Sequence, residues 1–308
     1  MTAPASLSPQ PSYALPGTAY EVPADSGAAQ VLAARASASA VVSAAAARIV
    51  PGSSFTPHPP ATAQKFRYSV GLARDAAEVR AAQQLRHLVF AEELGARLHG
   101  GEPGLDTDEF DPYCDHLVVR EDRTGMIVGT YRLLPPGRAA AAGGLYAAGE
   151  FEIGNHQALH GDLVEVGRSC VHPDHREGAV IGLMWAGIAR YLTDAGHNWL
   201  AGCCSIPLSD GGVLAADVRD AVNRKYLAPQ EYRVAPRRPW EVPAEVRDAE
   251  RGRSALPPLL RGYLRLGAWV CGEPAYDPDF GVADFYVLLS LRRTDARYLR
   301  RFLSLEAA

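Results

Sequence analysis

The sequence contains no run of about 18 apolar residues, the length that a membrane-spanning helix needs. Its first residues also lack the basic start and the continuous apolar stretch of a secretory signal. These two absences predict a soluble protein of the cytoplasm that is at most peripheral to the inner face of a membrane.

Paired cysteines are absent as well. No CxxC pair occurs among the five cysteines, so neither a disulfide framework nor a thiolate zinc site is indicated; they lie at positions 114, 170, 203, 204 and 271. Consecutive residues of a strand face opposite sides, and no Cys/His/Asp pattern accompanies Cys203 and Cys204. We therefore expect reduced thiols and no cysteine nucleophile.

The chain also lacks a strong charge of either sign. Its formal net charge is -4, and it has neither zinc-finger spacing nor an aromatic RNA-binding signature, which makes nucleic acid an unexpected partner. Two possible metal-binding patterns are also incomplete. His172 and His175 enclose a proline and lack the HExxH arrangement, and Asp106 and Asp108 lack the ligand order and glycine of a calcium loop. The sequence predicts no bound metal.

Composition divides the chain at about residue 65. Residues 1–64 are rich in Ala, Ser and Pro and poor in large apolar side chains, so we predict a disordered extension. Residues 31–50 within it are Ala-rich and could form a passive helix or lie on a membrane. Residues 65–308 are the expected single domain, since 47% hydrophobic content is ample for a core.

Hydrophobic periodicity predicts a mixed α/β fold for this domain. Two β-branched runs around a turn-like segment indicate a β-hairpin, and a strand, a helix and a strand follow it. Asp75 is a capping residue at the start of a long helix. The expected strands are residues 66–73, 116–120, 126–134, 162–171, 199–206 and 285–291, the expected helices are 75–94, 179–195 and 217–226, and residues 235–258 are expected to form a loop.

One stretch runs from ionisable residues through a turn to a glycine before a helix: Glu165-Val-Gly-Arg-Ser-Cys-Val-His-Pro-Asp-His-Arg-Glu-Gly178. Three others accompany it: Asp108-Glu-Phe-Asp-Pro-Tyr-Cys-Asp115, Gly129-Thr-Tyr-Arg132 and Cys271-Gly-Glu-Pro-Ala-Tyr-Asp-Pro-Asp-Phe280. Together they resemble the ornithine N-alpha-acyltransferases of bacterial ornithine-lipid synthesis, relatives of the acetyltransferase (GNAT) superfamily and of the acyl-homoserine lactone synthases. The resemblance implies a GNAT-like twisted mixed sheet flanked by helices.

The resemblance implies a general base and carboxylate-binding arginines. An α-amino group is mostly protonated near neutral pH, and Glu165 is the first choice to take its proton, although it could merely pair with an arginine. Arg132 and Arg168 could hold the acceptor's carboxylate in a bidentate fork or belong to a structural salt-bridge network. Arg86 and Phe90, one helical turn apart, are expected beside the active cleft, as in the lactone synthases.

It also implies sites for the thioester and for a cationic acceptor. The backbone N–H groups of Ser169, Cys170 and Val171 are expected to hydrogen-bond the thioester carbonyl. Ser169 is the one of the three expected to take part in catalysis. Three acidic residues could recognise the ornithine side chain, although their spacing equally suits a solvated loop; these are Asp108, Asp111 and Asp115.

The turn before the helix expected at residue 179 departs from the phosphate loop of acetyltransferases that use coenzyme A. Those commonly carry Gln/Arg-x-x-Gly-x-Gly/Ala, whose amides hold the pyrophosphate. Here one glycine is displaced, which favours acyl carrier protein as the donor, with Arg176 and Gly178 as its phosphate and pantetheine contacts. The basic excess in residues 219–238 could dock that acidic protein or be only solvated surface.

The expected reaction follows from the resemblance. A (3-hydroxy)fatty acyl group passes from acyl carrier protein, or from coenzyme A, to the α-amino group of L-ornithine, giving lyso-ornithine lipid without a tightly bound cofactor. Two alternatives stay open. One is a synthase of N-acyl amino acids or lactone-type signals with another acceptor, and the other is a catalytically degenerate module that binds carrier protein or membrane.

Overall fold

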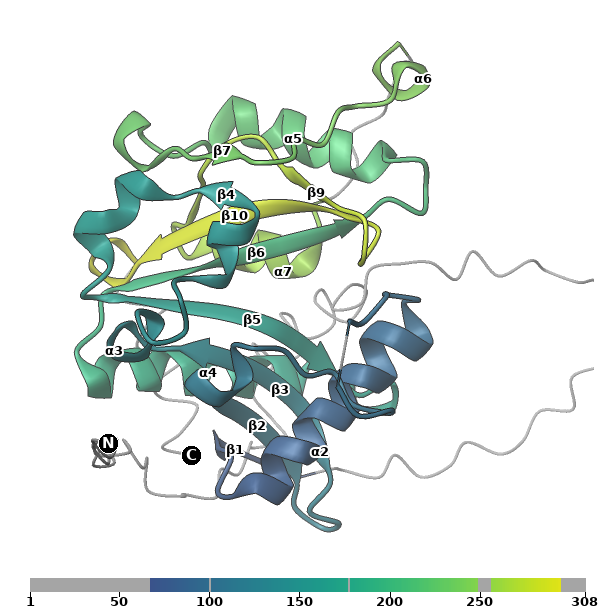
Figure 1. Ribbon diagram of the computed structural model, residues 1–308, viewed down its shortest axis with the longest axis vertical. Coiled ribbons are helices and arrows are strands. Elements are labelled where there is room, and N and C mark those ends of the chain that lie inside the picture. The colour runs from purple at the N-terminus through teal and green to yellow at the C-terminus, as the bar shows by residue number, and fades with distance from the viewer. Residues whose placement is uncertain (1–66, 100, 177, 249–255, 295–308) are drawn as a thin grey trace, which may run out of the picture.

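The computed structural model describes residues 67–99, 101–176, 178–248 and 256–294, so the extension expected at residues 1–64 lies outside the described residues. One twisted mixed sheet crosses the molecule (Figure 1). Its strands follow the order β1-β2-β3-β5-β6-β10-β8, with β9 beside β10, and only the β5 and β6 pair is parallel. The fold is the mixed α/β architecture that the sequence predicts.

The strands of the large sheet are β1 Tyr68–Leu72, β2 Asp115–Glu121, β3 Ile127–Leu134, β5 Leu163–Val171, β6 Trp199–Pro207, β8 Trp269–Val270, β9 Ala275–Asp277 and β10 Val282–Ser290. A small second sheet pairs β4 Phe151–Glu152 with β7 Ala235–Pro236. The α-helices are α2 Ala76–His87, α3 Pro136–Ala139, α4 Ala179–Ala195, α5 Val213–Lys225, α6 Ala244–Arg247 and α7 Pro258–Arg265. Short turns of other helix types include η1 Leu88–Glu93, η2 Asp111–Tyr113 and η3 Tyr146–Gly149.

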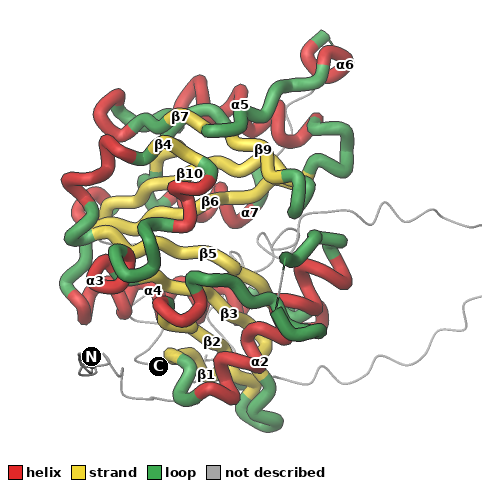
Figure 2. The backbone as a smooth tube through the Cα atoms, viewed as in Figure 1, coloured by secondary structure: helices red, strands yellow, loops and turns green. Residues whose placement is uncertain are grey.

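The hairpin of β2 and β3 and the β5, α4, β6 succession confirm the sequence predictions, and Figure 2 shows both. Asp75 caps α2 by accepting a hydrogen bond from the Glu78 N–H at 2.9 Å. The prediction of one continuous α-helix to residue 94 was wrong, because the α-helix ends at His87 and a π-helical turn, η1, follows it. The loop expected at 235–258 was partly wrong, since it contains β7 and α6 and leads into α7.

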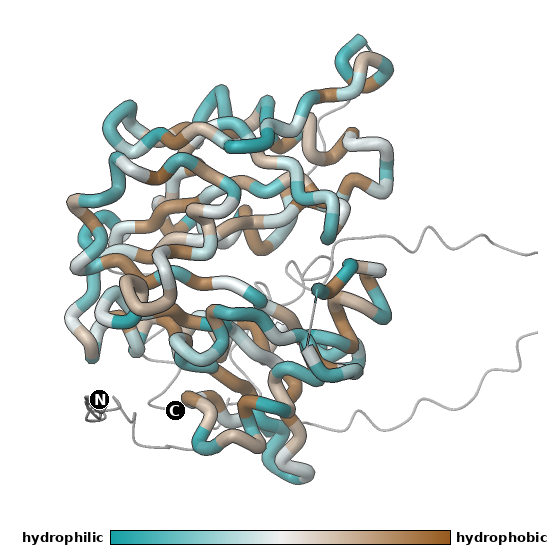
Figure 3. Tube along the Cα trace, in the orientation of Figure 1, coloured by the Kyte–Doolittle hydropathy of each residue, from teal (hydrophilic) through white to brown (hydrophobic). Residues whose placement is uncertain are grey.

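Apolar residues line both faces of the large sheet. Figure 3 shows the concentration of apolar residues along the strands and of hydrophilic ones in the outer loops. The larger core joins α4 and α7 to one face of the sheet, where Val164 and Val166 of β5 are buried. The opposite face packs against α2 and against the segment around η3, where Leu163 of β5 is buried. Residues of alternate parity on β5 thus point to different sides.

Strands β5 and β6 pair over three positions only, from Leu163 with Trp199 to Glu165 with Ala201. Beyond them the strands separate. Gly202 stands at the branch point, where a Cβ would lie 2.2 Å from the Val166 carbonyl oxygen, so only glycine permits this approach of the two backbones. The parallel pair therefore opens into a gap in the middle of the sheet.

A β-bulge lies on the other edge of β5 at the same level. Opposite β3, Thr130 pairs with Cys170 but Arg132 pairs with Gly167, so the register shifts by one residue. Arg168 has a φ of 51°, the only positive value at a non-glycine among the described residues. This left-handed conformation costs free energy for a residue with a Cβ, and such strain concentrates at functional sites. The bulge aims the Arg168 side chain into the space beside the separated strands.

Candidate active site

The gap between β5 and β6 opens into a cavity of about 920 Å³. Strands β3, β5, β6 and β10 form its floor, and η1 and the loop after β9 form part of its walls. A cavity of this size accommodates a small acceptor together with part of a long donor. Apart from Asp115, Cys170, Val171 and Gly178, every site residue proposed from the sequence lines it or belongs to the ion network beside it.

Glu165 lies at the last paired position of β5 and is 5% exposed. Its carboxylate accepts hydrogen bonds from the Tyr146 N–H at 2.6 Å and the Ala147 N–H at 2.8 Å, both at the start of η3. Burial raises the pKa of Glu165 to about 7, although these hydrogen bonds and the nearby Arg132 oppose the change. A carboxylate with a pKa near neutrality that lines the cavity can accept a proton there.

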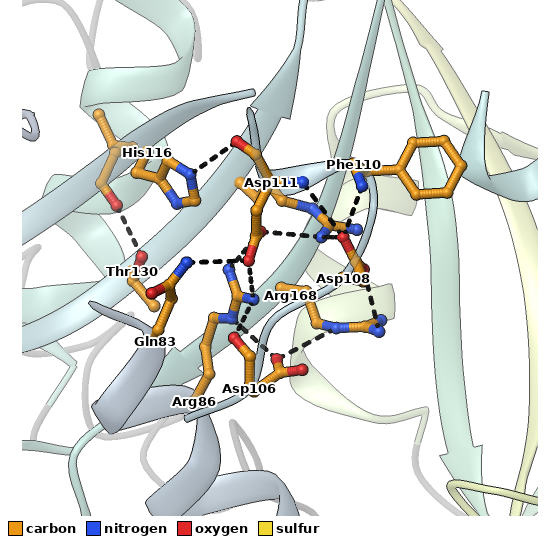
Figure 4. Close-up of polar contacts among 11 residues, drawn as sticks. Gln83, Arg86, Asp106, Asp108, Phe110, Asp111, His116, Thr130 and Arg168 are labelled. Carbon is orange, nitrogen blue, oxygen red and sulfur yellow. Dashed lines mark hydrogen bonds and ion pairs between the residues drawn. The ribbon is translucent and has the colours of Figure 1, made fainter. Parts of the chain in front are cut away.

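Three arginines and three aspartates form a buried ion network beside Glu165, which Figure 4 shows in part. Arg86 on α2 is 0% exposed. Its Nε lies 2.8 Å from Asp106 Oδ2, and its Nη2 lies 2.9 Å from Asp111 Oδ2. Arg132 Nη1 lies 2.5 Å from Asp108 Oδ1 and 3.1 Å from Asp111 Oδ1. These contacts balance the network's charges, as buried ions require.

Arg168 is held less tightly than the other two arginines. Its Nε lies 3.2 Å from Asp106 Oδ2 and its Nη2 lies 3.4 Å from Asp108 Oδ2. The buried Nε makes no well-aligned hydrogen bond. The guanidinium stands 5.1 Å from the ring centre of Tyr146 and 5.0 Å from that of Phe280. Arg168 therefore faces the cavity with hydrogen-bonding capacity that its partners do not use.

The three aspartates expected to recognise a cationic acceptor occupy different surroundings. Asp108 and Asp111 are neutralised by the arginines of the ion network. Asp115 lies outside the cavity lining, where it accepts a hydrogen bond from the Tyr191 hydroxyl at 2.7 Å and pairs with Arg138 at 2.5 Å. An ammonium group would find these carboxylates already occupied.

Other residues proposed from the sequence are divided between the cavity and the core. Ser169 and Phe90 line the cavity, and the Phe90 ring lies 5.8 Å from that of Phe280. The side chains of Cys170 and Val171 are buried in the packing on either face of the sheet, so only their main-chain groups could meet a ligand. Burial raises the pKa of the Cys170 thiol to about 12, which keeps it protonated.

A second acidic group lines the cavity, and the sequence did not suggest it. Carboxylate oxygens of Glu150, Asp277 and Asp284 lie within 4.8 Å of one another. Asp284, which is 2% exposed, accepts a hydrogen bond from the Ser205 hydroxyl at 2.6 Å. In the part of the chain that the structure describes, no ion pair involves any of the three. We call these three residues the acidic trio.

The electrostatics of the acidic trio differ from those of the ion network. Burial and the neighbouring carboxylates raise the pKa values of Glu150 and Asp284, because each negative charge disfavours the next. A cation placed among the three oxygens would lower these pKa values and offset part of the negative charge. The trio suits an ammonium group or a metal ion chemically.

The donor contacts expected from the sequence lie at one end of the cavity. Arg176 lines it, but its guanidinium is paired with Glu93 of η1 at 2.8 and 2.6 Å and donates to the Val171 carbonyl. Gly178 is the residue before α4 and has a φ of 91°. Nearby Arg97 is exposed at the wall of the cavity. A donor phosphate would have to compete with Glu93 for Arg176.

The basic run at 219–238 is largely engaged within the fold. Arg219 pairs with Glu273, Arg233 donates to the Ala228 carbonyl at 2.9 Å, and Arg237 donates to the Ala148 carbonyl at 2.7 Å. All five cysteines are free thiols. Among the described residues, no helix is long and apolar enough to cross a bilayer.

Known proteins similar to this chain carry related descriptions. The family described as Acetyltransferase (GNAT) domain matches residues 85–186. An L-ornithine N(alpha)-acyltransferase of Rhodobacter capsulatus is 37% identical over 247 residues, which are 77% of this chain and 95% of that protein. One of Rhizobium meliloti is 36% identical over 253 residues, 75% and 82% of the two chains.

Solved structures with a similar fold include TofI bound to an inhibitor and MTA, with a TM-score of 0.44 and 17% identity over 77% of this chain and 98% of that one. The CoA-dependent acyl-homoserine lactone synthase BjaI, solved with SAM and isopentyl-CoA, has a TM-score of 0.43 and 15% identity over 74% and 81% of the two chains.

Proposed function

Because the chain belongs to the family of L-ornithine N(alpha)-acyltransferases, we propose that its cavity binds L-ornithine with the α-amino group beside Glu165 and the side-chain ammonium at the acidic trio. The enzyme is an N-acyltransferase that acylates ornithine. The observation that carries the proposal is the acidic trio: unlike the aspartates of the ion network, it forms no ion pair with an arginine among the described residues.

The two ends of ornithine need opposite charges from the protein. Arg168 lines the cavity, and its Nη2 contact with Asp108 is long at 3.4 Å, so its guanidinium suits the α-carboxylate, and Arg132 supports it from the neighbouring strand. The δ-ammonium then points toward Asp284 on β10, which lies across the open gap from β5. Between these two ends Glu165 faces the α-nitrogen. The acceptor is thus oriented by charge at both ends.

The chemistry needs a proton acceptor and a site for negative charge. Glu165 takes one proton from the α-ammonium, directly or through a water, and the amine nitrogen then attacks the thioester carbonyl. Main-chain N–H groups of Ser169 to Val171 stabilise the oxyanion that forms. As the C–S bond breaks, the nitrogen's second proton passes to the sulfur, so the products are an amide and a thiol.

The donor is a fatty acyl thioester on acyl carrier protein, and the product is lyso-ornithine lipid. Support comes from the displaced glycine before α4 and from the pairing of Arg176 with Glu93, which leaves the Arg176 guanidinium less available to a pyrophosphate. Exposed Arg97 beside the cavity is available to an acidic partner. We place the reaction in the cytoplasm at the membrane surface, where its lipid product accumulates.

Replacing Asp284 by Asn is expected to lower kcat/KM for ornithine about 10- to 100-fold, since a hydrogen bond to a charged group contributes about 1.5–3 kcal/mol. The kcat/KM for norvaline, which lacks the δ-amino group, should change little in the variant. The measurement is thiol release with each acceptor and a 3-hydroxyacyl carrier protein, with product mass as confirmation. Asp162→Asn is the control, because Asp162 lies outside the cavity lining, where its carboxylate accepts hydrogen bonds from Asn198.

If Asp284→Asn lowered kcat/KM equally for ornithine and norvaline, the acidic trio would not recognise the acceptor's side chain. Calcium, magnesium or a chelator should leave wild-type turnover unchanged; dependence on a divalent cation would instead assign the trio to a metal. Faster turnover with acyl-coenzyme A than with acyl carrier protein would overturn the proposed donor. No thiol release with ornithine would overturn the proposed function itself.

A further inference from the structure

The proposed base, Glu165, is held by a short segment that belongs to neither sheet. Its carboxylate accepts hydrogen bonds from the N–H groups of Tyr146 and Ala147, the first two residues of the four-residue turn η3. Burial raises the pKa of Glu165, and these two hydrogen bonds oppose that change because they favour the ionised carboxylate. The position of η3 therefore affects how readily Glu165 takes a proton.

The same segment reaches two other parts of the site. The ring centre of Tyr146 lies 5.1 Å from the Arg168 guanidinium. Glu150 follows η3 directly and contributes its carboxylate to the acidic trio. Residues 146–150 thus contact both the base and the arginine, and they supply one member of the trio. A displacement of this segment would disturb all three.

Arg237 holds this segment from outside the cavity lining. Its Nε donates a hydrogen bond to the Ala148 carbonyl at 2.7 Å, and its main-chain N–H donates to the Glu150 carbonyl at 2.7 Å. The Arg237 side chain is exposed, and the residue does not line the cavity. Arg237 therefore contacts η3 without contacting the place where the substrates react.

The internal hydrogen bonds of η3 fix its end only in part. The Ala148 N–H donates to the Leu145 carbonyl at 3.0 Å, and the Glu150 N–H donates to the Ala147 carbonyl at 3.1 Å. Turns of this 3₁₀ type are short, and their hydrogen-bond geometry is poorer than that of an α-helix. The carbonyl groups of Ala148 and Glu150 both accept from Arg237, which anchors the end of the turn.

The stretch 235–240, which carries Arg237, is itself fixed on two sides. Strand β7 pairs with β4, directly after η3, and Figure 1 shows the two strands beside each other. On the other side, the Tyr276 N–H donates to the Arg238 carbonyl at 2.8 Å, and the Trp240 N–H donates to the Pro274 carbonyl at 2.9 Å. The backbone at Arg237 is thus a firm support, and its side chain can hold a second segment in place.

We propose that Arg237 is a positioning residue for ornithine acylation, which keeps η3 where its two N–H groups meet the Glu165 carboxylate. This inference rests on the proposed function and adds a residue that acts on the base from outside the cavity. Without the Arg237 guanidinium η3 can shift, and its hydrogen bonds to the carboxylate weaken.

Weaker hydrogen bonds to the carboxylate raise the pKa of Glu165 further, because the ionised form loses its donors. The other titratable groups that interact with Glu165 belong to other elements and are not altered by a substitution of Arg237. They are Arg132, Asp108, Cys114, Cys203 and Tyr286.

The test is the pH dependence of kcat/KM for ornithine in Arg237→Met, which keeps an apolar stem and loses the donor. The wild-type activity is expected to rise through pH 7 as Glu165 ionises. In the variant this limb should move to higher pH by about 0.5–1 unit, which corresponds to part or all of one hydrogen bond. Activity at pH 7 should then fall about two- to fivefold and approach the wild-type activity at pH 9. Arg237→Lys, which keeps a donor, should restore most of the wild-type profile.

Arg247→Met is the matched control. Arg247 is also exposed and donates to a main-chain carbonyl, that of Val242 at 2.9 Å, but it lies outside the cavity lining and away from η3. Its profile should match that of the wild type. Recovery of Arg237→Met at pH 9 shows that this variant is folded.

An unshifted limb in Arg237→Met, at any level of activity, would overturn the inference, and so would an equal shift in Arg247→Met. Both results would leave ornithine acylation intact. A limb that persists in Glu165→Gln would overturn the proposed base, and a wild-type enzyme that releases no thiol with ornithine would overturn the proposed function. The failures are therefore distinguishable.

Discussion

Glu165→Gln is expected to reduce kcat for ornithine acylation by about 10²- to 10⁴-fold, the usual contribution of general acid–base catalysis. The amide retains the shape of the side chain and can still accept a hydrogen bond from the N–H of Tyr146 or Ala147. It cannot take a proton from the α-ammonium. The KM for ornithine should change little, since Arg168 and the acidic trio hold the acceptor. Steady-state thiol release at saturating donor measures both constants.

The matched control is Glu121→Gln. Glu121 is also a buried glutamate, 3% exposed, and its carboxylate accepts hydrogen bonds from the N–H groups of Arg123 and Thr124. It is the last residue of β2 and lies outside the cavity lining. Its substitution should leave kcat within about twofold. Equal losses in the two variants would mean that a buried glutamate is needed only for folding.

Arg86→Met is expected to destabilise the protein by about 3–5 kcal/mol, because it strands two buried carboxylates without their cation. Arg86 is 0% exposed and contacts Asp106 and Asp111. At roughly 2–4 °C per kcal/mol for a domain of this size, the melting temperature should fall by about 10 °C. Differential scanning calorimetry measures this. Arg80→Met is the control, because Arg80 pairs with Glu102 on the surface and should leave the melting temperature nearly unchanged.

The same network sets a pH dependence of stability. Burial opposes ionisation of Asp111, but the hydrogen bonds and charge of Arg86 prevail and hold its pKa well below its ordinary value. A carboxyl group with a lowered folded-state pKa contributes its full stabilisation above its unfolded pKa of about 3.9, and this contribution is lost progressively as the pH falls from that value through the folded-state pKa. The deficit of Arg86→Met should therefore shrink in acid. A deficit that stays constant from pH 7 to pH 3 would contradict the network's role.

Local patterns in the sequence predicted much of the fold. The turn between two β-branched runs gave the β2 and β3 hairpin, and periodicity gave α4 between β5 and β6. Helix α7 was missed because it begins at Pro258, inside a segment rich in proline and charge. The π-helical turn η1 could not be distinguished from α-helix, because its sequence, LVFAEE, contains no glycine or proline that would end an α-helix.

The site was predicted where its residues share a strand or a motif. Glu165 and Arg168 lie on one strand, and both line the cavity. The acidic trio was missed because Glu150 and Asp284 are far apart in the chain and meet only through the order of the strands. The partners of Asp108 and Asp111 also depend on long-range packing against α2 and β3. A sequence displays acids and arginines without showing which of them neutralise each other.

The strained backbone of Arg168 shows the same limit. Nothing in its local sequence, a glycine before it and a serine after it, specifies that the arginine rather than Gly167 takes the positive φ. The register between β3 and β5 decides this, because two residues of β5 face one of β3 at the bulge. The strained conformation is therefore imposed by the pairing of the strands, and it directs the Arg168 side chain into the cavity.

The most direct test of Glu165 as the base is the pH dependence of kcat/KM for ornithine in the wild-type enzyme and in Glu165→Gln. Because burial raises the pKa of Glu165 to about 7, the wild-type activity should rise as the pH increases through that value. The variant should lose this limb and keep only the dependence on deprotonation of the acceptor's α-ammonium group. A variant that retains the limb near pH 7 at reduced activity would show that another group accepts the proton.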